Sequence, residues 1–272
     1  MAFNTAYDLE SLMVNTKAAT VYTAHENSLF LGGSLIPSVQ LPNGSFTAQI
    51  PLMGEATATK IVQSAPDSTT EDFTSQTLTD TSVTIHANIY ASRHTMRDLG
   101  GIDPSETGRV LGNSIQAAFD ADCITAMNGL TASTTDADPM TVNAIIDAVA
   151  QVRGTGEMGA LVGILSPAEA ANLLKAVGAA AYAGGDFQTE GLRNGYIGMI
   201  GGVQMFTSHY VSGANKGFIF GKDALRIAMF KGVDLEVQRR AAAVGNDIVA
   251  SLHAGVGVVD ATRGIKLINV AP

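Results

Sequence analysis

One long amphipathic helix, expected over Asp103–Gly129, constrains the fold of this chain more than any other stretch. Its start is well marked, because Asp103 can cap the helix, Pro104 suits the first helical position and Glu106 can complete a capping box. Apolar residues then recur every fourth position along one face, at Leu111, Ile115, Phe119, Cys123 and Met127. Polar residues take the opposite face, at Arg109, Asn113, Gln116 and Asp120. At about 1.5 Å per residue such a helix spans roughly 35–40 Å, enough to serve as a spine for the chain.

The segment before this helix alternates with a period of two residues and predicts a long β-hairpin. Two runs carry the pattern, with apolar residues at Phe46, Ala48, Ile50 and Leu52 and at Val83, Ile85, Ala87 and Ile89. A polar stretch, Ser64–Ser75, lies between them. An extended arm from Ser45 to Gln63 would reach roughly 50–60 Å, whereas a compact chain of 272 residues has a radius of gyration of only about 18–19 Å. We therefore expect the hairpin to lie on a neighbouring subunit.

The rest of the chain predicts an arm, a mixed α/β unit and a second sheet. Residues 1–44 are expected to form an arm, with a short amphipathic piece at Tyr7–Met13, a helix over Lys17–Phe30 and an extended connector. The α/β unit is predicted from a helix, a strand, a third helix and three short strands, over Met140–Val152, Ala160–Leu165, Ser166–Val177, Tyr196–Ile200, Val203–Thr207 and Phe218–Phe220. Glu169 would complete a capping box with Ser166 at the start of the third helix. Three final strands, over Val233–Gln238, Ile248–Val259 and Ile265–Val270, are expected to form a sheet against the spine helix, which would make the α/β unit an insertion.

The composition argues against several classes of protein. A net charge of −9 with only 16 basic residues predicts that the chain repels nucleic acid, so we do not expect non-specific DNA binding. We expect no sequence-specific DNA binding either. No apolar run is long enough to cross a bilayer, and we expect no membrane partner. Charged residues make up only 15% of the chain, which indicates that much of its surface meets other protein. The single cysteine, Cys123, lies on the apolar helix face and is expected to be packed and inert.

The sequence contains no recognisable catalytic or metal-binding motif. The run Gly195–Gly202 matches neither a dinucleotide-binding nor a P-loop pattern and is better explained by turns at strand ends. The five histidines are scattered without the spacing of a metal site. Ser208, His209 and Asp147 lack the elbow that would position a nucleophile. We therefore expect no catalytic residue, no cofactor and no metal, and a small-molecule-binding α/β enzyme stays only as an alternative.

Three stretches of sequence carry a resemblance to a known family. The first is GILSPAEAANLL (163–174), which is similar to a strand–Asn/Ser-Pro–helix segment of that family's A-domain. The second is GMIGGVQMFTS (198–208), which is similar to a common loop–Gly–Val–strand–Ser segment. The third is FIFGKDALRIAMFKGVDLEVQRR (218–240) with DIVASLHAGVGVVDATRGIKLI (247–268), which looks like the return to the P-domain. With the order of arm, hairpin, spine helix, α/β unit and sheet, the whole chain resembles the Hong Kong 97-like major capsid proteins of tailed bacteriophages, of the short-tailed or a related marine type.

The resemblance implies an α+β fold class and a division of the chain into five parts. These are an N-terminal arm (1–43), an E-loop hairpin (44–92), a P-domain part with the spine helix (93–130), an A-domain (131–221) and a P-domain return with its sheet (222–272). The family's A-domain carries a loop at the five- or six-fold axis. In this chain the axis-facing residues would be Gly184, Gly185, Asp186, Phe187 and Gln188.

The function implied by the resemblance is structural. A major capsid protein assembles with itself as hexamers and pentamers into an icosahedral shell around double-stranded DNA, in the host cell cytoplasm, and stays in the virion. The further partners implied are a separate scaffolding protein, a portal and a decoration protein. Some members cross-link a hairpin lysine covalently, but Lys60 is the only candidate here and no partner is evident for it, so we expect a non-covalent shell. An encapsulin-type compartment, which has the same shell fold but houses an enzyme, stays as an alternative.

Charges of opposite sign are segregated along the chain. The hairpin carries acidic residues at Glu55, Asp67, Glu71 and Asp72, and the densest basic group is Arg226, Lys231, Arg239 and Arg240. One interpretation is that the acidic hairpin docks on the basic group of a neighbouring subunit. The other is that these are solvated charges, each worth under about 1 kcal/mol. The sequence leaves both open.

Overall fold

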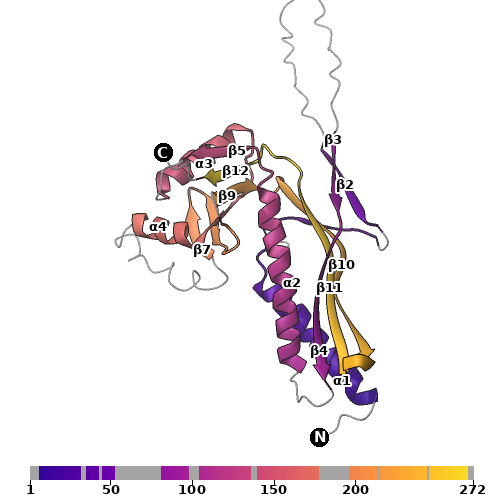
Figure 1. Ribbon diagram of the computed structural model, residues 1–272. Helices are drawn as coiled ribbons and strands as arrows, with labels where there is room; N and C mark the ends of the chain where they lie inside the picture. Colours follow the sequence, from indigo (N-terminus) through magenta and orange to yellow (C-terminus); the bar gives the residue numbers. More distant parts are fainter. Residues whose placement is uncertain are drawn as a thin grey trace, which may run out of the picture.

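A long helix, α2 (Pro104–Met127), runs through the computed structural model and carries the rest of the fold (Figure 1). The structure describes residues 6–31, 35–42, 45–52, 81–97, 104–135, 140–177, 196–212, 215–243 and 245–268, and the statements below concern these residues. The spine helix predicted from the sequence is confirmed. Its apolar face is at most 1% exposed at Leu111, Ile115, Phe119, Cys123 and Met127. The placement of Asp120 on an exposed face is wrong, because this side chain is also only 1% exposed.

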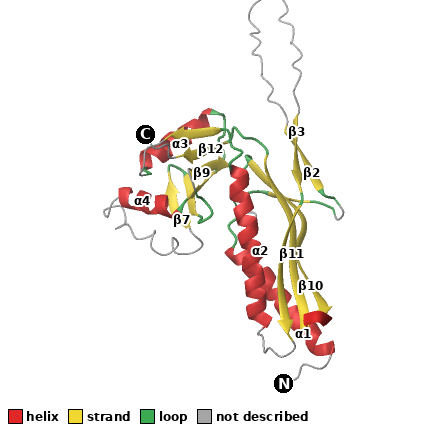
Figure 2. Ribbon diagram, in the orientation of Figure 1, coloured by secondary structure: helices red, strands yellow, loops and turns green. Residues whose placement is uncertain are grey.

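One side of α2 packs against a four-stranded sheet whose strands run alongside the helix (Figures 1 and 2). The strands stand in the order β1 (Ser38–Gln40), β10 (Leu225–Arg240), β11 (Gly245–Val258) and β4 (Asn88–Arg97). Neighbours are antiparallel except for β1 and β10, and a short 3-10 helix, η2 (Ala241–Ala243), joins β10 to β11. Every second residue of β11 belongs to the same core as α2, at Ile248, Ala250, Leu252 and Ala254. The strands predicted at Val233–Gln238 and Ile248–Val259 are confirmed as parts of these longer strands.

The helix α1 (Ala6–Asn27) packs along α2 on the lower half of the molecule (Figure 1). The helix predicted over Lys17–Phe30 is confirmed as far as Asn27. The separate short piece predicted at Tyr7–Met13 is wrong, because it belongs to the same continuous helix. Its apolar residues are spread around the helix, so that Val14 and Tyr22 are more than half exposed while Ala24 is buried. A helix without one apolar face gives no periodic signal in the sequence.

Two glycines of α2 allow α1 to approach closely. A Cβ atom at Gly108 would lie 2.6 Å from the carbonyl oxygen of Thr16, and one at Gly112 would lie 2.6 Å from that of Thr20. Side chains at these two positions would keep the helices further apart. The contact between α1 and α2 therefore depends on the absence of side chains rather than on a large apolar stripe.

The α/β unit lies beside the upper end of α2 and contains a six-stranded sheet (Figure 2). Its strands stand in the order β5 (Ala132–Thr135), β12 (Gly264–Ile268), β9 (Asn215–Gly221), β6 (Leu161–Leu165), β8 (Val203–Thr207) and β7 (Tyr196–Ile200). Two helices belong to it, α3 (Val142–Gly154) and α4 (Pro167–Val177). All six elements predicted in this unit are confirmed, as α3, β6, α4, β7, β8 and β9. All five residues of β6 are buried, as its uninterrupted apolar run requires.

The strand β12 corrects one prediction. The sequence placed Ile265–Val270 in the sheet against the spine helix, but β12 pairs with β5 and β9 inside the six-stranded sheet. Ile265 and Leu267 are at most 1% exposed and belong to the core formed with α3 and α4. The α/β unit is therefore not a closed insertion, because a strand that follows β10 and β11 in sequence completes its sheet.

The second capping box is formed only in part. Ser166 Oγ accepts a hydrogen bond from the Glu169 N–H at 3.3 Å, as predicted. The Glu169 carboxylate does not return to Ser166, whose N–H donates to the carbonyl of Lys216. It accepts instead from the Met140 N–H at 3.1 Å and from the Asn172 amide at 3.2 Å, and pairs with the Lys216 ammonium at 3.2 Å. Burial opposes the charge on Glu169, but these donors outweigh it and lower the pKa of the carboxyl.

The hairpin is confirmed at its base. Strands β2 (Thr47–Leu52) and β3 (Thr81–His86) pair antiparallel, from Thr47 opposite His86 to Leu52 opposite Thr81. Residues 53–80 lie outside the described residues. After Ala87 the strand β3 leads directly into β4, which belongs to the four-stranded sheet. The hairpin and the central sheet therefore share one nearly continuous strand (Figure 1).

Candidate assembly surfaces

The described residues contain no candidate metal centre. Within them no group of three His, Cys, Asp or Glu side chains could hold a metal ion, and no helix is long and apolar enough to cross a membrane. Ser208 is buried, whereas His209 and Asp147 are exposed. Gly201 and Gly202 form the turn between β7 and β8 and both have positive φ, 60° and 81°. The interpretation of that glycine-rich run as a turn is confirmed, since such φ values favour glycine.

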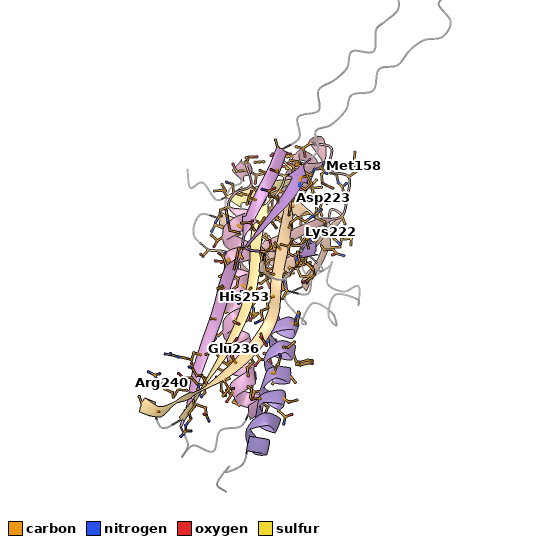
Figure 3. The ribbon with its side chains drawn as sticks, turned by 90° about the vertical axis from the view of Figure 1, so that its right-hand side faces the viewer. Met158, Lys222, Asp223, Glu236, Arg240 and His253 are labelled. Carbon is orange, nitrogen blue, oxygen red and sulfur yellow. The ribbon has the colours of Figure 1, made fainter. Side chains whose placement is uncertain are left out.

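The basic residues predicted as one group lie along β10 rather than in one patch. Figure 3 shows Lys222 and Asp223, just before the strand, at the opposite end of the sheet from Arg240. Arg226 lies near the first end of β10, and Arg239 and Arg240 at the other. At about 3.3 Å per residue, Arg226 and Arg240 are roughly 45 Å apart along the strand. We therefore treat the two ends of β10 as separate surfaces.

The two basic residues nearer the start of β10 are paired within the chain. Arg226 donates to Asp223 Oδ1 at 2.7 Å and to the Lys222 carbonyl at 2.7 Å. Lys231 contacts Asp234 Oδ2 at 2.7 Å, and Lys17 of α1 contacts the Oδ1 of the same carboxylate at 2.9 Å. Hydrogen bonds from Lys17 and Lys231 hold the pKa of Asp234 well below its usual range. These charges serve local pairs, and one of the pairs fastens α1 to the sheet.

Three arginines gather at the far end of the sheet. Arg240 and Arg93 both point at Asp247, with Nη1–Oδ2 distances of 3.5 and 4.0 Å. Both arginine side chains are about half exposed, whereas the Asp247 side chain is 11% exposed. Arg239 is also exposed at this end. We call Arg93, Arg239 and Arg240 the basic tip; within it, Arg93 and Arg240 share the single carboxylate of Asp247.

A buried carboxylate that the sequence placed at the surface fastens the segment after α1 to the spine helix. Asp120 accepts hydrogen bonds from the Ser28 hydroxyl at 2.6 Å, the Leu29 N–H at 3.2 Å and the Gln116 amide at 2.8 Å. Burial raises the pKa of Asp120, and these three donors offset only part of that effect. The only local signal is Gln116, one turn earlier on the same helix. Ser28 and Leu29 could not be identified as partners from a helical pattern.

A second network, also not predicted, joins the two sheets. Arg263, in the turn between β11 and β12, donates to Asp260 Oδ2 at 2.9 Å and to Glu157 Oε2 at 3.2 Å. Glu157 follows α3 and is 5% exposed, so Arg263 supplies the counter-charge for a buried carboxylate. The Arg263 carbonyl also accepts a hydrogen bond from the Gly221 N–H at 2.9 Å, where β9 leads toward β10. Arg263 thus connects the turn between β11 and β12 with Glu157 after α3 and with the end of β9.

The remaining predicted contact residues lie outside the described residues. These are the hairpin acids Glu55, Asp67, Glu71 and Asp72 and the loop residues Gly184, Gly185, Asp186, Phe187 and Gln188. Their roles stay predictions.

Comparison with known proteins gives similarity in structure but none in sequence. No family model matches the chain, and no curated protein matches it. The capsid of the cyanophage P-SCSP1u matches with a TM-score of 0.68 and 14% identity, over 90% of each chain. The capsid of Ralstonia phage GP4 matches with a TM-score of 0.65 and 15% identity, over 93% of this chain and 92% of the other. A virus-like particle from Pyrococcus furiosus matches with a TM-score of 0.64 and 12% identity, over 94% of this chain and 98% of the other.

Each of these matches covers at least nine tenths of this chain and of the other. Identities below about 15% identify a fold and not a residue-by-residue correspondence. The expectation drawn from the order of the elements is therefore confirmed at the level of architecture: this chain has the α+β, Hong Kong 97-like capsid fold.

Proposed function

We propose that this protein is the major capsid protein of a tailed bacteriophage, which assembles with itself as hexamers and pentamers into an icosahedral shell around double-stranded DNA. The observation that carries the proposal is the match to phage capsids over nearly the full length of both chains. The low content of charged residues supports it, as do large exposed apolar side chains such as Phe46 and Ile89, which are 74% and 64% exposed. Such residues become buried when copies pack together.

Within this proposal each part of the chain has a role in the shell. Residues 1–43 are the N-terminal arm, 44–92 the E-loop, 93–130 and 222–272 the P-domain, and 131–221 the A-domain. The change of strand partner at Ala87 favours an E-loop that ends there rather than at residue 92, and the pairing of β12 with β9 favours an A-domain that also takes residues 264–268.

The test of shell formation is the size of the particles that the protein forms. We expect multi-angle light scattering and negative-stain microscopy on the chain, alone and with a candidate scaffolding protein, to give closed icosahedral particles, or hexamers and pentamers that convert to them. A chain that stays monomeric or dimeric under all these conditions would refute the function. Single-chain bands on a denaturing gel are expected from such particles, because the proposed shell is non-covalent.

A second part of the proposal concerns the contact between subunits. The acidic hairpin residues Glu55, Asp67, Glu71 and Asp72 dock on the basic tip of a neighbouring copy. The shared Asp247 supports this, because it leaves the charges of Arg93 and Arg240 only partly neutralised. Electrostatic complementarity of this kind fixes orientation and accelerates association more than it strengthens binding.

Reversal of charge at two positions tests the docking contact. Arg239→Glu combined with Arg240→Glu should block assembly while the circular dichroism spectrum of the unassembled chain stays unchanged. The matched control is Lys175→Glu combined with Lys222→Glu, which lowers the net charge equally at two exposed positions away from the basic tip. Normal particles from the first variant would rule the contact out.

The match to the Pyrococcus furiosus particle favours one alternative, a compartment that encloses protein instead of DNA. The contents of particles purified from the native source distinguish the two. DNA of genome length protected from nuclease supports the phage shell, whereas particles free of DNA that contain one enzyme would favour the compartment. A separate scaffolding protein, a portal and a decoration protein are the further partners we propose for the phage shell, and its location is the virion, after assembly in the host cytoplasm.

A further inference from the structure

Strand β3, which connects the hairpin to β4, crosses over the face of the central sheet. Strand β4 pairs with β11 as far as Asn88, which lies opposite Ala254. Two residues earlier, His86 is paired with Thr47 of the hairpin instead. The Ala87 N–H donates to the Phe46 carbonyl at 2.9 Å and marks the change of partner. Figure 3 views the sheet from the side opposite α2, with the strands of the hairpin base at its upper end.

Two glycines of β11 lie directly under this crossing. A Cβ atom at Gly255 would be 2.2 Å from the carbonyl oxygen of His86 and 2.9 Å from Ile85 Cγ2. A Cβ atom at Gly257 would be 2.9 Å from Ile85 Cγ1. Side-chain Cβ atoms essentially never approach other heavy atoms below 3.0 Å. Neither glycine has a positive φ, so the backbone alone does not require glycine there, and the close approach of β3 is the reason for both.

The base of the hairpin is seated by a small core of its own. Ile85 is 2% exposed and packs with Ala48 of β2 and with Ala228 and Phe230 of β10. Ala228 stands opposite Gly255 in the register of β10 and β11. The surface under the crossing therefore combines Gly255, Gly257 and Ala228, whose side chains have one carbon or none, with Phe230, and β3 approaches the backbone of β11 at the two glycines.

We propose that Gly255 and Gly257 set the direction in which the hairpin leaves the body of the subunit, and thereby where it meets the next copy in the shell. Only the statement about the next copy in the shell rests on the proposed function. The two glycines are positioning residues, because they act through β3 and need not touch another subunit.

The expected displacement follows from the geometry of the strand. Moving the His86 carbonyl from 2.2 Å to at least 3.0 Å from a new Cβ requires a lift of nearly 1 Å. The strand is held at Asn88, about 7 Å from His86, while Thr81 is about 23 Å from Asn88 at about 3.3 Å per residue. A lift at His86 is thus magnified roughly threefold, to about 3 Å at Thr81.

The experiment measures hairpin direction and assembly separately. Spin labels on Thr81→Cys and Lys222→Cys, both exposed positions, report the distance between hairpin and body in the unassembled chain, while the native Cys123 is buried and escapes labelling. The variants are Gly255→Ala and Gly257→Ala. The matched control is Gly232→Ala on β10, where a Cβ meets nothing within 4 Å.

We expect Gly255→Ala to move the mean label distance by about 3 Å, from the lever estimated at 3.3 Å per residue, and to abolish closed particles or change their diameter. Gly257→Ala should have a smaller effect, because its obstacle is a side chain rather than backbone, and it keeps the test valid if Gly255→Ala does not fold. Gly232→Ala should match the unmodified chain in both measurements. Unchanged distances in both variants would overturn the role of the glycines. If the label distance shifts but the particles keep the diameter of those from the unmodified chain, the link to assembly is overturned. If the unmodified chain forms no particles, the proposed function alone is refuted.

Discussion

Replacing Gly112 by alanine tests how tightly α1 is seated on α2. The new Cβ would lie 2.6 Å from the Thr20 carbonyl oxygen and 3.1 Å from Thr23 Cβ. Since the oxygen belongs to the backbone of α1, no side chain can rotate away, and the whole helix must move outward. That movement strains the hydrogen bond from the Asn27 amide to Asn113 Oδ1, which is 2.8 Å long.

Two opposing effects set the size of the change in stability. Forcing an extra methyl group into a packed contact costs about 1–3 kcal/mol. Alanine in place of glycine within a helix returns up to about 1 kcal/mol. Gly112→Ala should therefore lower the free energy of unfolding by about 0–2 kcal/mol. Gly154→Ala in α3 is the matched control, because nothing lies within 4 Å of its Cβ, and it should be neutral or stabilising.

Urea unfolding of the unassembled chain measures both variants and a third, Gly108→Ala with Gly112→Ala. Once α1 has moved away for one methyl group, the second is accommodated at little extra cost, so the double variant should lose less than the sum of the single changes. The thermal midpoint offers a second measurement, with a shift of roughly 2–4 °C per kcal/mol for chains of similar size. Equal stabilisation by Gly112→Ala and Gly154→Ala would refute the reasoning, as would a fully additive double variant.

Three further outcomes follow from the buried and paired groups. Asp120→Ala should lower the free energy of unfolding by about 1–3 kcal/mol per donor left unpaired, whereas Asp120→Asn, which keeps one acceptor oxygen, should lose less; denaturation midpoints compare the two. The pKa of Asp234 is lowered, so the stabilisation from its pair with Lys17 is present above the usual carboxyl pKa of about 4 and is lost as the pH falls below it. Asp234→Asn should remove that acid-dependent loss from melting curves recorded between about pH 5 and pH 2. Burial raises the pKa of the Cys123 thiol, so thiol reagents should modify it only as fast as the chain unfolds globally; rapid labelling of the folded chain would contradict this.

Elements with a strong local signal could be predicted from the sequence. The helix α2 has an apolar residue every fourth position, and β6 is a short apolar run followed by Ser166-Pro167, which starts α4. These signals lie within one element and need no knowledge of its neighbours. The helix α1 has no such signal, because its contact with α2 comes from small residues on both helices.

Features that depend on distant pairing could not be predicted. The sequence of β12 has an alternating apolar pattern, but this pattern does not indicate which of the two sheets the strand joins. The pairing of Ile265 with Ile219 of β9 places it in the six-stranded sheet. Asp120 lies among polar neighbours on its helix, and only the arrival of Ser28 and Leu29 buries it. The basic residues could be identified from the sequence, but their separation could not, because it follows from the length of β10, which places Arg226 at the end opposite the basic tip.

The continuous strand from β3 into β4 also has a mechanical consequence. A force that pulls the hairpin along its own axis passes through Ala87 into β4, which pairs with β11 in continuous register from Asn88 to Arg97. Because that pull runs parallel to the strands and the inter-strand hydrogen bonds run across them, these bonds are loaded together in shear instead of opening one after another. A load on the hairpin is thus spread over all the residue pairs that join β4 to β11 beside the spine helix. The subunit is built to resist tension at the place where the proposed shell, filled with DNA, would stretch it.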